Sequence, residues 1–240
     1  MTRIRRAMVL AAGLGTRLRP LTDRLPKPLV TVAGETLIDR ILDRLAEAGV
    51  EEVVVNLHHK ADQLSDHLAR RSGPRIIESH EESLLETGGG VRRALPLLGG
   101  DPFFVVNGDV LWRNGRRSAL ERLATAWDDR RMDALLLLQR TVSAVGYDGH
   151  GDFMLTQDGM VRRPKPGEVP PYIFAGVQIL HPRLFADAPA DPFSLTRLYF
   201  PAAEAGRLGG ILHDGEWYHV GTLEALAEAE ETLATAKVWL

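Results

Sequence analysis

The chain has 240 residues, of which 45% are hydrophobic and 25% charged, and it contains no cysteine. This composition is ordinary for a single α/β domain and excludes a disulfide framework, a thiolate zinc site and a cysteine nucleophile. The net charge of −3 argues against a nucleic-acid partner, although positive charge gathered in one pocket would still allow an anionic ligand. The apolar run 7–12 is too short for a membrane span or a signal peptide, so we expect no membrane association and a cytoplasmic location.

Apolar runs and helical periodicities alternate along the first half of the chain. Residues 7–12 form a continuous apolar run that predicts a strand buried on both faces. A long polar segment, 13–34, follows it, and segments of this length are usually functional. The elements expected next are helices over 37–45, 61–71, 89–97 and 118–127, and strands over 53–57, 75–78, 103–106 and 133–139. This alternation predicts an α/β fold with an open, mostly parallel sheet and helices on both faces.

The second half of the chain has shorter elements separated by glycine and proline. The elements expected there are strands over 153–155, 160–162, 172–180 and 217–220, and helices over 194–205 and 222–236. No linker, repeat or low-complexity stretch interrupts the pattern. We therefore expect one domain, 1–240, whose two lobes, about 1–110 and 111–240, face a cleft.

Two segments after the first strand are suited to binding phosphate. The first is Leu10-Ala-Ala-Gly-Leu-Gly-Thr-Arg-Leu-Arg-Pro-Leu-Thr22, and the second is Pro26-Lys-Pro-Leu29. Glycines let backbone N–H groups approach an anion, Arg17 offers a fork of donors, and Lys27 is a point charge between two prolines. The chain lacks a P-loop, and a dinucleotide fingerprint would need a third glycine where Leu18 stands. The glycines taken alone would fit a tight turn equally well.

A carboxylate follows another buried strand, in the run Val106-Asn-Gly-Asp109. Ligands of open α/β sheets bind at the carboxyl ends of the strands, so we expect this run and the glycine loop to share one site. Asp109 could reach a phosphate-bound magnesium ion, which favours one or two carboxylates with phosphate oxygens and water. The alternative is an aspartate that only forms a turn.

Together these motifs resemble the signature of the sugar-1-phosphate nucleotidyltransferases, also called NDP-sugar pyrophosphorylases. The resemblance continues through Leu85-Glu-Thr-Gly-Gly-Gly90 and Trp217-Tyr-His-Val-Gly-Thr222, so it covers nearly the whole chain. It implies a Rossmann-like mixed, mostly parallel sheet flanked by helices. It also implies an enzyme that transfers a nucleoside monophosphate from an NTP to a sugar 1-phosphate and releases pyrophosphate.

The substrates expected from the resemblance are UTP and N-acetylmuramate 1-phosphate, in cell-wall sugar recycling. The short chain and the segment 85–90 favour this pair. Four alternatives stay open: a mannose-1-phosphate guanylyltransferase, a glucose-1-phosphate thymidylyl- or uridylyltransferase, transfer to another phosphate such as phosphocholine, and a non-catalytic nucleotide-sugar sensor. We expect a monomer or a small homo-oligomer.

The resemblance also implies the site residues. The catalytic residues expected are Arg17, Lys27 and Asp109. The nucleotide-binding residues expected are Leu10, Ala11, Ala12, Gly13, Gly15, Thr16, Arg17, Lys27, Glu86, Thr87, Gly88 and Gly89, where Thr87 could also cap a helix. The sugar-binding residues expected are Asn107, Gly151, Asp152, Ala175 and Gly176.

The expected cofactor is Mg²⁺, with Mn²⁺ as the alternative, and the expected metal ligands are Asp109 and His219. His219 stands where related enzymes commonly have an aspartate that completes the metal site. Imidazole suits softer metals than magnesium. The alternative for His219 is a packing or hydrogen-bonding role. Lys165 is expected on an exposed loop, with binding of the sugar phosphate as the alternative, and Trp217 is expected in the core.

Overall fold

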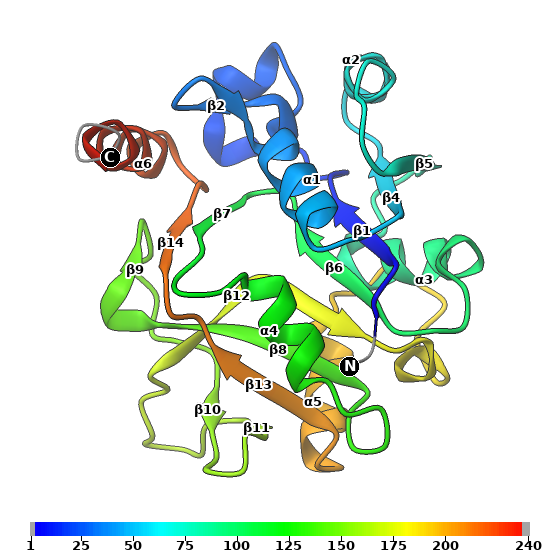
Figure 1. Cartoon of the computed structure of the whole chain (residues 1–240), viewed down its shortest axis with the longest axis vertical. Helices are drawn as coiled ribbons and strands as arrows, with labels where there is room; N and C mark the ends of the chain where they lie inside the picture. Colours follow the sequence, from blue (N-terminus) through cyan, green and yellow to red (C-terminus); the bar gives the residue numbers. More distant parts are fainter. Residues whose placement is uncertain (1–2, 237–240) are drawn as a thin grey trace.

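The computed structural model describes residues 3–236 and is built around one seven-stranded sheet (Figure 1). Its strands lie in the order β13-β8-β12-β6-β1-β4-β5. Their bounds are β1 Arg6–Leu10, β4 Glu52–Leu57, β5 Arg75–His80, β6 Phe103–Asn107, β8 Ala134–Arg140, β12 Tyr172–Leu180 and β13 Leu208–Leu212. All of these strands are parallel except β12, which pairs antiparallel with β6 and with β8. The prediction of a mixed, mostly parallel sheet is therefore confirmed.

Helices cover both faces of this sheet. Their bounds are α1 Leu37–Glu47, α2 Ala61–Leu68, α3 Glu86–Leu98, α4 Ala119–Ala126 and α5 Thr196–Glu204, whereas a further helix, α6 Leu223–Ala236, packs on strands outside this sheet. Side chains alternate along a strand, so Val9 of β1 belongs to the apolar cluster on the face covered by α1, α2 and α4, whereas Met8 belongs to the cluster on the face covered by α3 and α5. The continuous apolar run of β1 thus reflects burial on both faces.

The helix predicted over 37–45 shows how its sequence dictates its ends. The Thr36 side chain accepts a hydrogen bond from Asp39 N at 3.1 Å and caps the first turn. After the helix, Gly49 adopts a φ of +78°, which glycine tolerates and which ends the helix. The apolar positions at helical spacing are all buried, as the pattern predicts.

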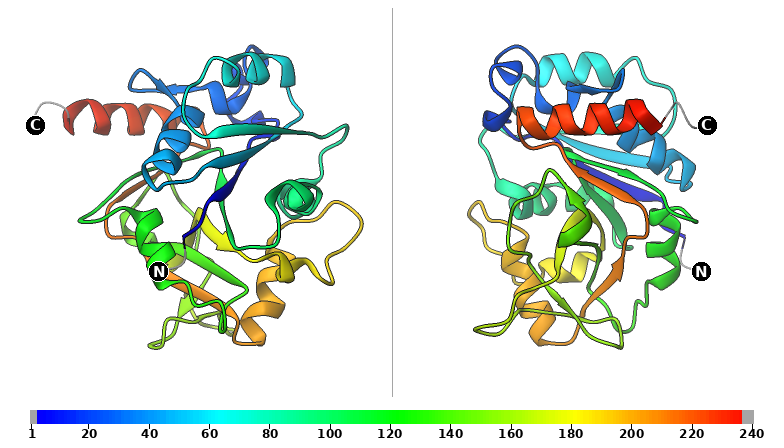
Figure 2. Two further views of the ribbon diagram at one scale, coloured as in Figure 1. Left: turned by 45° about the vertical axis from the view of Figure 1, so that its right-hand side comes forward. Right: turned by 90° about the vertical axis from the view of Figure 1, so that its left-hand side faces the viewer.

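A second, three-stranded sheet stands beside the main one, in the order β7-β14-β9. Its strands are β7 Val110–Arg113, β9 Ala144–Val145 and β14 Glu216–His219. The register of β14 on β7 places His219 opposite Val110, the residue after Asp109. Two further views show α6 lying along one side of the molecule (Figure 2), where it contacts β2, β9 and β14.

Several short elements escaped the sequence-based prediction. The polar segment 13–34 holds the 3₁₀ helices η1 Thr16–Leu18, η2 Leu21–Asp23 and η3 Lys27–Leu29, and the strand β2 Thr31–Val32, which pairs with β3 Glu35–Thr36. In the segment 140–185 the unpredicted elements are η4 Thr141–Ser143 and η5 Pro182–Phe185, whereas β10 Met154–Leu155 and β11 Val161–Arg162 lie within the strands predicted over 153–155 and 160–162. β13 was missed because Gly209 and Gly210 break its apolar pattern. A Cβ on Gly210 would lie 2.6 Å from Val161 Cγ2, so the glycine lets β11 pack over the sheet.

Candidate active site

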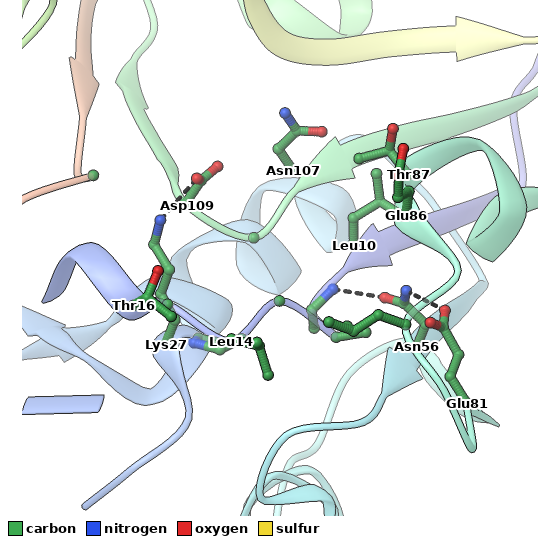
Figure 3. Close-up of a pocket in the computed structure, with 18 of the residues that line it drawn as sticks. Leu10, Leu14, Thr16, Lys27, Asn56, Glu81, Glu86, Thr87, Asn107 and Asp109 are labelled. Atoms are coloured by element: carbon green, nitrogen blue, oxygen red, sulfur yellow. Dashed lines mark hydrogen bonds and ion pairs between the residues drawn. The ribbon is translucent and has the colours of Figure 1, made fainter. Parts of the chain in front are cut away.

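A cleft of about 460 Å³ opens where β1, β4, β5 and β6 end. Its lining residues are Leu10, Ala11, Ala12, Gly13, Leu14, Gly15, Thr16, Arg17, Lys27, Pro28, Asn56, Glu81, Leu84, Glu86, Thr87, Asn107, Gly108, Asp109 and Gly221. Figure 3 shows Asp109 with Lys27 on one side, Glu86 and Thr87 on the other, and Asn107 between them. The cleft therefore lies at the sheet edge where open α/β proteins bind ligands.

The loop after β1 is held against the following segment by Gly15. Gly15 has a φ of +62°, and a Cβ there would lie 2.8 Å from Thr22 Cγ2 and 3.0 Å from Lys27 Cβ. The hydroxyl of Thr22 donates to the Gly15 carbonyl at 2.8 Å. The glycine therefore does more than turn the chain, because it brings the loop that carries Arg17 into contact with the segment that carries Lys27. Arg17 itself is exposed and lines the cleft.

Lys27 and Asp109 form an ion pair in the wall of the cleft. Lys27 Nζ donates to Asp109 Oδ2 at 2.8 Å, and the two side chains are 11% and 29% exposed. Lys27 opens η3 directly after the extended residue Pro26, so its backbone has little freedom. Segments far apart in the sequence thus bring a fixed cation and a fixed anion together.

The carboxyl group of Asp109 is held in its ionised form. Burial alone would raise its pKa, but the charge and hydrogen bond of Lys27, and then the charges of His219 and Arg17, lower the pKa below its usual value. A carboxylate that stays ionised and faces a cleft is suited to binding a cation.

Gly108 sets the position of Asp109 relative to the glycine loop. Gly108 N donates to the carbonyl of Leu10 at 2.9 Å, directly after the last register pair of β1 and β6, Leu10 with Asn107. A Cβ on Gly108 would lie 2.6 Å from that carbonyl oxygen, so only glycine allows the close approach. The loop after β1 and the loop after β6 are therefore joined directly at the cleft.

His219 lies close to this group of charges, and its buried Nε2 has no hydrogen-bond partner among residues 3–236. Its ring packs against Gly221, which lines the cleft, and edge-on against Trp217. Burial lowers the pKa of His219; Asp109 opposes this shift, and Lys27 and Arg17 add to it. In the part of the chain that the structure describes, no three His, Cys, Asp or Glu residues are grouped to hold a metal ion. Metal binding by His219 stays a prediction.

Two buried polar residues in the cleft wall were missed from the sequence. Asn56, 3% exposed, accepts from Ala11 N at 2.6 Å and donates to Glu81 Oε1 at 2.7 Å. Glu81, 5% exposed, accepts from Leu85 N at 3.2 Å through its other oxygen. The sequence held a signal for Asn56, since it is a polar residue inside the apolar strand 53–57, whereas Glu81 follows a strand without any such mark.

The start of α3 differs from the expected nucleotide-binding segment. Glu86 and Thr87 line the cleft, but Gly88 and Gly89 do not, because their N–H groups both donate to the Phe193 carbonyl, at 2.8 and 3.1 Å. The absence of a side chain at these two glycines leaves room for the Phe193 loop. Thr87 does not cap α3; its hydroxyl accepts from Leu195 N at 2.9 Å.

The residues expected to bind the sugar are only partly at the cleft. Of the five, Asn107 lines it, and Gly176, with a φ of +76°, packs beneath the Asn107 side chain. Ala175 is fully buried, and its carbonyl accepts from Trp217 Nε1 at 2.8 Å. The Asp152 carboxylate accepts from the backbone of β12, and Gly151 packs against the Pro170 carbonyl.

The structure agrees with the predicted locations of Trp217 and Lys165. Trp217 is buried in the core, and Lys165 lies on an exposed loop outside the cleft. Among residues 3–236, no helix is both long and apolar enough to cross a membrane.

The fold and the charged cleft define a nucleotide-handling α/β enzyme, and comparison with known proteins identifies the class. The family model described as nucleotidyl transferase matches residues 6–236, so the chain belongs to this family and is a nucleotidyltransferase. The N-acetylmuramate alpha-1-phosphate uridylyltransferase of Caulobacter vibrioides is 48% identical over 235 residues, which is 96% of this chain and 97% of that protein. The enzyme of the same name from Neisseria meningitidis is 40% identical, over 98% of this chain and 99% of its own length.

A more distant relative agrees with this assignment, and a solved structure shares the fold. The mannose-1-phosphate guanylyltransferase catalytic subunit beta of Drosophila pseudoobscura pseudoobscura is 31% identical over 90% of this chain, which corresponds to 59% of that protein. A crystal structure of UDP-glucose pyrophosphorylase with UDP-glucose superposes with a TM-score of 0.82 at 18% identity, over 97% of this chain and 99% of that one. At that identity the likeness supports the fold alone.

Proposed function

We propose that the enzyme transfers UMP from UTP to N-acetylmuramate 1-phosphate, giving UDP-N-acetylmuramate and pyrophosphate. The observation that carries the proposal is the placement of Arg17, Lys27 and Asp109 in the lining of one cleft. The choice of substrates rests on the names of the two similar uridylyltransferases, which align with this chain over nearly their full lengths.

The chemistry that this cleft has to support is an in-line displacement at phosphorus. An oxygen of the sugar phosphate forms a bond to the α-phosphorus of UTP, and the bond from that phosphorus to the bridging oxygen breaks, so that pyrophosphate carries away the electron pair. Both reactants are anions, and catalysis of such a step depends on positioning and charge neutralisation rather than on a protein nucleophile. We assign the loop 13–17 and Arg17 to the triphosphate, and Lys27 to the charge near the α-phosphorus.

Asp109 fits a magnesium ion bound to phosphate. Its carboxylate is ionised and lines the cleft, and Mg²⁺ typically takes one or two carboxylates together with phosphate oxygens and water. One carboxylate is therefore enough, and Mn²⁺ shares the preference for oxygen ligands. His219 is a weaker candidate, because imidazole is a softer ligand. The ion would neutralise phosphate charge, while Lys27 and Arg17 orient the reactants.

The same proposal gives the enzyme a cellular setting. N-acetylmuramate is a sugar of peptidoglycan, so an enzyme that activates its 1-phosphate would serve the recycling of cell-wall sugars in the cytoplasm. We expect the enzyme to work as a monomer or a small homo-oligomer, with no nucleic-acid or membrane partner.

A substrate panel tests the proposal. Pyrophosphate release is measured with Mg²⁺ and UTP, GTP, dTTP or CTP, each paired with N-acetylmuramate, mannose or glucose 1-phosphate, or with phosphocholine. We expect the highest kcat/KM for UTP with N-acetylmuramate 1-phosphate, and loss of release in Asp109→Asn. A higher value for GTP with mannose 1-phosphate would make the enzyme a guanylyltransferase, and no release with any pair would indicate a nucleotide-sugar sensor.

A further inference from the structure

A buried hydrogen-bonded pair connects the two walls of the cleft. Asn56, near the end of β4, and Glu81, just after β5, are both almost fully buried. They link Ala11, on the loop after β1, to Leu85, at the start of α3, through bonds of 2.6, 2.7 and 3.2 Å. Figure 3 shows Asn56 bonded on one side to the loop after β1 and on the other side to Glu81. The pair is distinct from Arg17, Lys27 and Asp109, to which the proposed function assigns the phosphates and the metal ion.

The donor and acceptor directions of these hydrogen bonds explain why one residue is an amide and the other a carboxylate. The Ala11 N–H can only donate, so it requires the oxygen of Asn56, and the amide nitrogen of Asn56 must then donate to Glu81. The paired register of β1 with β4 ends at Val9. Beyond that point the Asn56 side chain, in place of a backbone carbonyl, accepts the hydrogen bond of Ala11 N. The carboxylate of Glu81 accepts at both oxygens and so completes the chain of bonds.

Helix α3 carries a glycine, Gly90, at the place where it packs against the pair. A Cβ on Gly90 of α3 would lie 2.9 Å from Glu81 Oε1 and 3.0 Å from Asn56 Nδ2. A glycine in a helix interior is less favourable than alanine, because its backbone loses more conformational freedom on folding. Gly90 therefore makes α3 less stable than alanine would, at the position where the helix contacts the pair.

We propose that Asn56 and Glu81 are positioning residues for the nucleotide: they set the separation between the Ala11 loop and the start of α3. This inference rests on the proposed function, in which the cleft binds an NTP. Both flanking segments contribute to the lining of the cleft. If the pair is broken, the two walls lose their fixed spacing, and the nucleotide is held less tightly although the loop 13–17, Arg17 and Lys27 are unchanged. The sugar phosphate, which we place toward Asn107, should be affected less.

The direction of the bonds gives a reversal test. In Asn56→Asp, one oxygen still accepts from Ala11 but the other faces the Glu81 carboxylate. In Glu81→Gln, one of the two acceptor oxygens is replaced by a donor. The new amide nitrogen then faces another donor, either the Leu85 N–H or the Asn56 amide nitrogen. In the double variant, the amide introduced at position 81 can donate to the carboxylate introduced at position 56 and accept from Leu85. All three hydrogen bonds then form again, with the middle one reversed.

The measurements are the Kd of the nucleotide, by calorimetry on the full-length enzyme with Mg²⁺, and the separate KM values and kcat. We expect each single variant to raise the nucleotide Kd and KM about tenfold, since small misplacements of binding groups are costly. The KM for the sugar phosphate and kcat should change much less, and the double variant should recover nucleotide binding. The matched control is Gln178→Leu, which removes a buried amide bonded to Tyr199, outside the cleft lining, and should leave the nucleotide Kd unchanged.

If the single variants do not fold, Gly90→Ala supplies the test, because its methyl group displaces the pair while removing no polar group. We expect it also to raise the nucleotide Kd. Unchanged nucleotide binding in folded variants, equal effects on both substrates, or a double variant no better than the singles would overturn the inference. The nucleotide used is the one that gives turnover in the panel, so a wrong assignment of UTP would be recognised separately.

Discussion

Replacing Lys27 with methionine would test the ion pair at the centre of the cleft. Methionine keeps an unbranched stem of similar size, so the contact with Gly15 is preserved and only the charge is lost. Asp109 is then left without its 2.8 Å partner. Removing one partner of a fully buried pair costs roughly 3–5 kcal/mol. Since the Asp109 side chain is 29% exposed, we expect a smaller loss of about 2 kcal/mol in the free energy of unfolding near neutral pH.

The pH dependence of this loss has a definite sign. The pKa of Asp109 in the folded enzyme lies below the usual value for an aspartate, because Lys27 stabilises the ionised carboxylate. Such a group contributes stability above its unfolded pKa, and this contribution disappears as the pH falls through the folded value. The difference in stability between the enzyme and Lys27→Met should therefore be fully present near neutral pH and shrink below about pH 4.

Urea unfolding at several pH values, followed by circular dichroism, would measure this difference. In the same variant we expect kcat/KM to fall by about 10²–10³, the usual effect of losing a group that stabilises developing charge. Equal stability of the two proteins near neutral pH, or a difference that grows toward acid, would refute the reasoning about the pair. Full activity would refute the role of Lys27 in catalysis.

Four further substitutions test separate parts of the site. Asp109→Asn should lower pyrophosphate release about 100-fold or more while nucleotide binding, measured by calorimetry, survives in part; wild-type turnover would exclude Asp109 as a metal ligand. Arg17→Ala should raise the KM for the nucleotide about tenfold, because a charged hydrogen bond to phosphate is lost; an unchanged KM would place the triphosphate elsewhere. His219→Asp should keep or raise magnesium-dependent activity, and complete loss would show that the imidazole has another task. Gly108→Ala should lower Tm and reduce the unfolding free energy by about 1–3 kcal/mol, because its Cβ would press on the Leu10 carbonyl; unaltered thermal melting would contradict that contact.

The parts of the fold that follow from local pattern were predictable from the sequence. The apolar run of β1 and the helical spacing in α1 predict which faces of these elements are buried. The positions of the strand ends predict where the charged residues lie together. Arg17, Lys27 and Asp109 lie in the lining of one cleft, as that argument expects. Their individual roles stay predictions.

The parts that depend on contacts distant in sequence were not predictable in the same way. Gly88 and Gly89 match a nucleotide-binding motif, but only the fold reveals that the Phe193 loop takes their N–H groups. Glu81 lies in the cleft wall, where Asn56 and Leu85 satisfy its two oxygens, and no local pattern in the sequence shows that these three residues meet. β13 was hidden because glycines that admit β11 break its apolar pattern.

A crystal structure of the enzyme with UTP and Mg²⁺ would locate the triphosphate directly. We predict that it lies along the loop 13–17, with Arg17 and Lys27 in contact with phosphate oxygens and Asp109 directed at the metal ion. A triphosphate bound away from these three side chains would contradict the placement of the active site in this cleft.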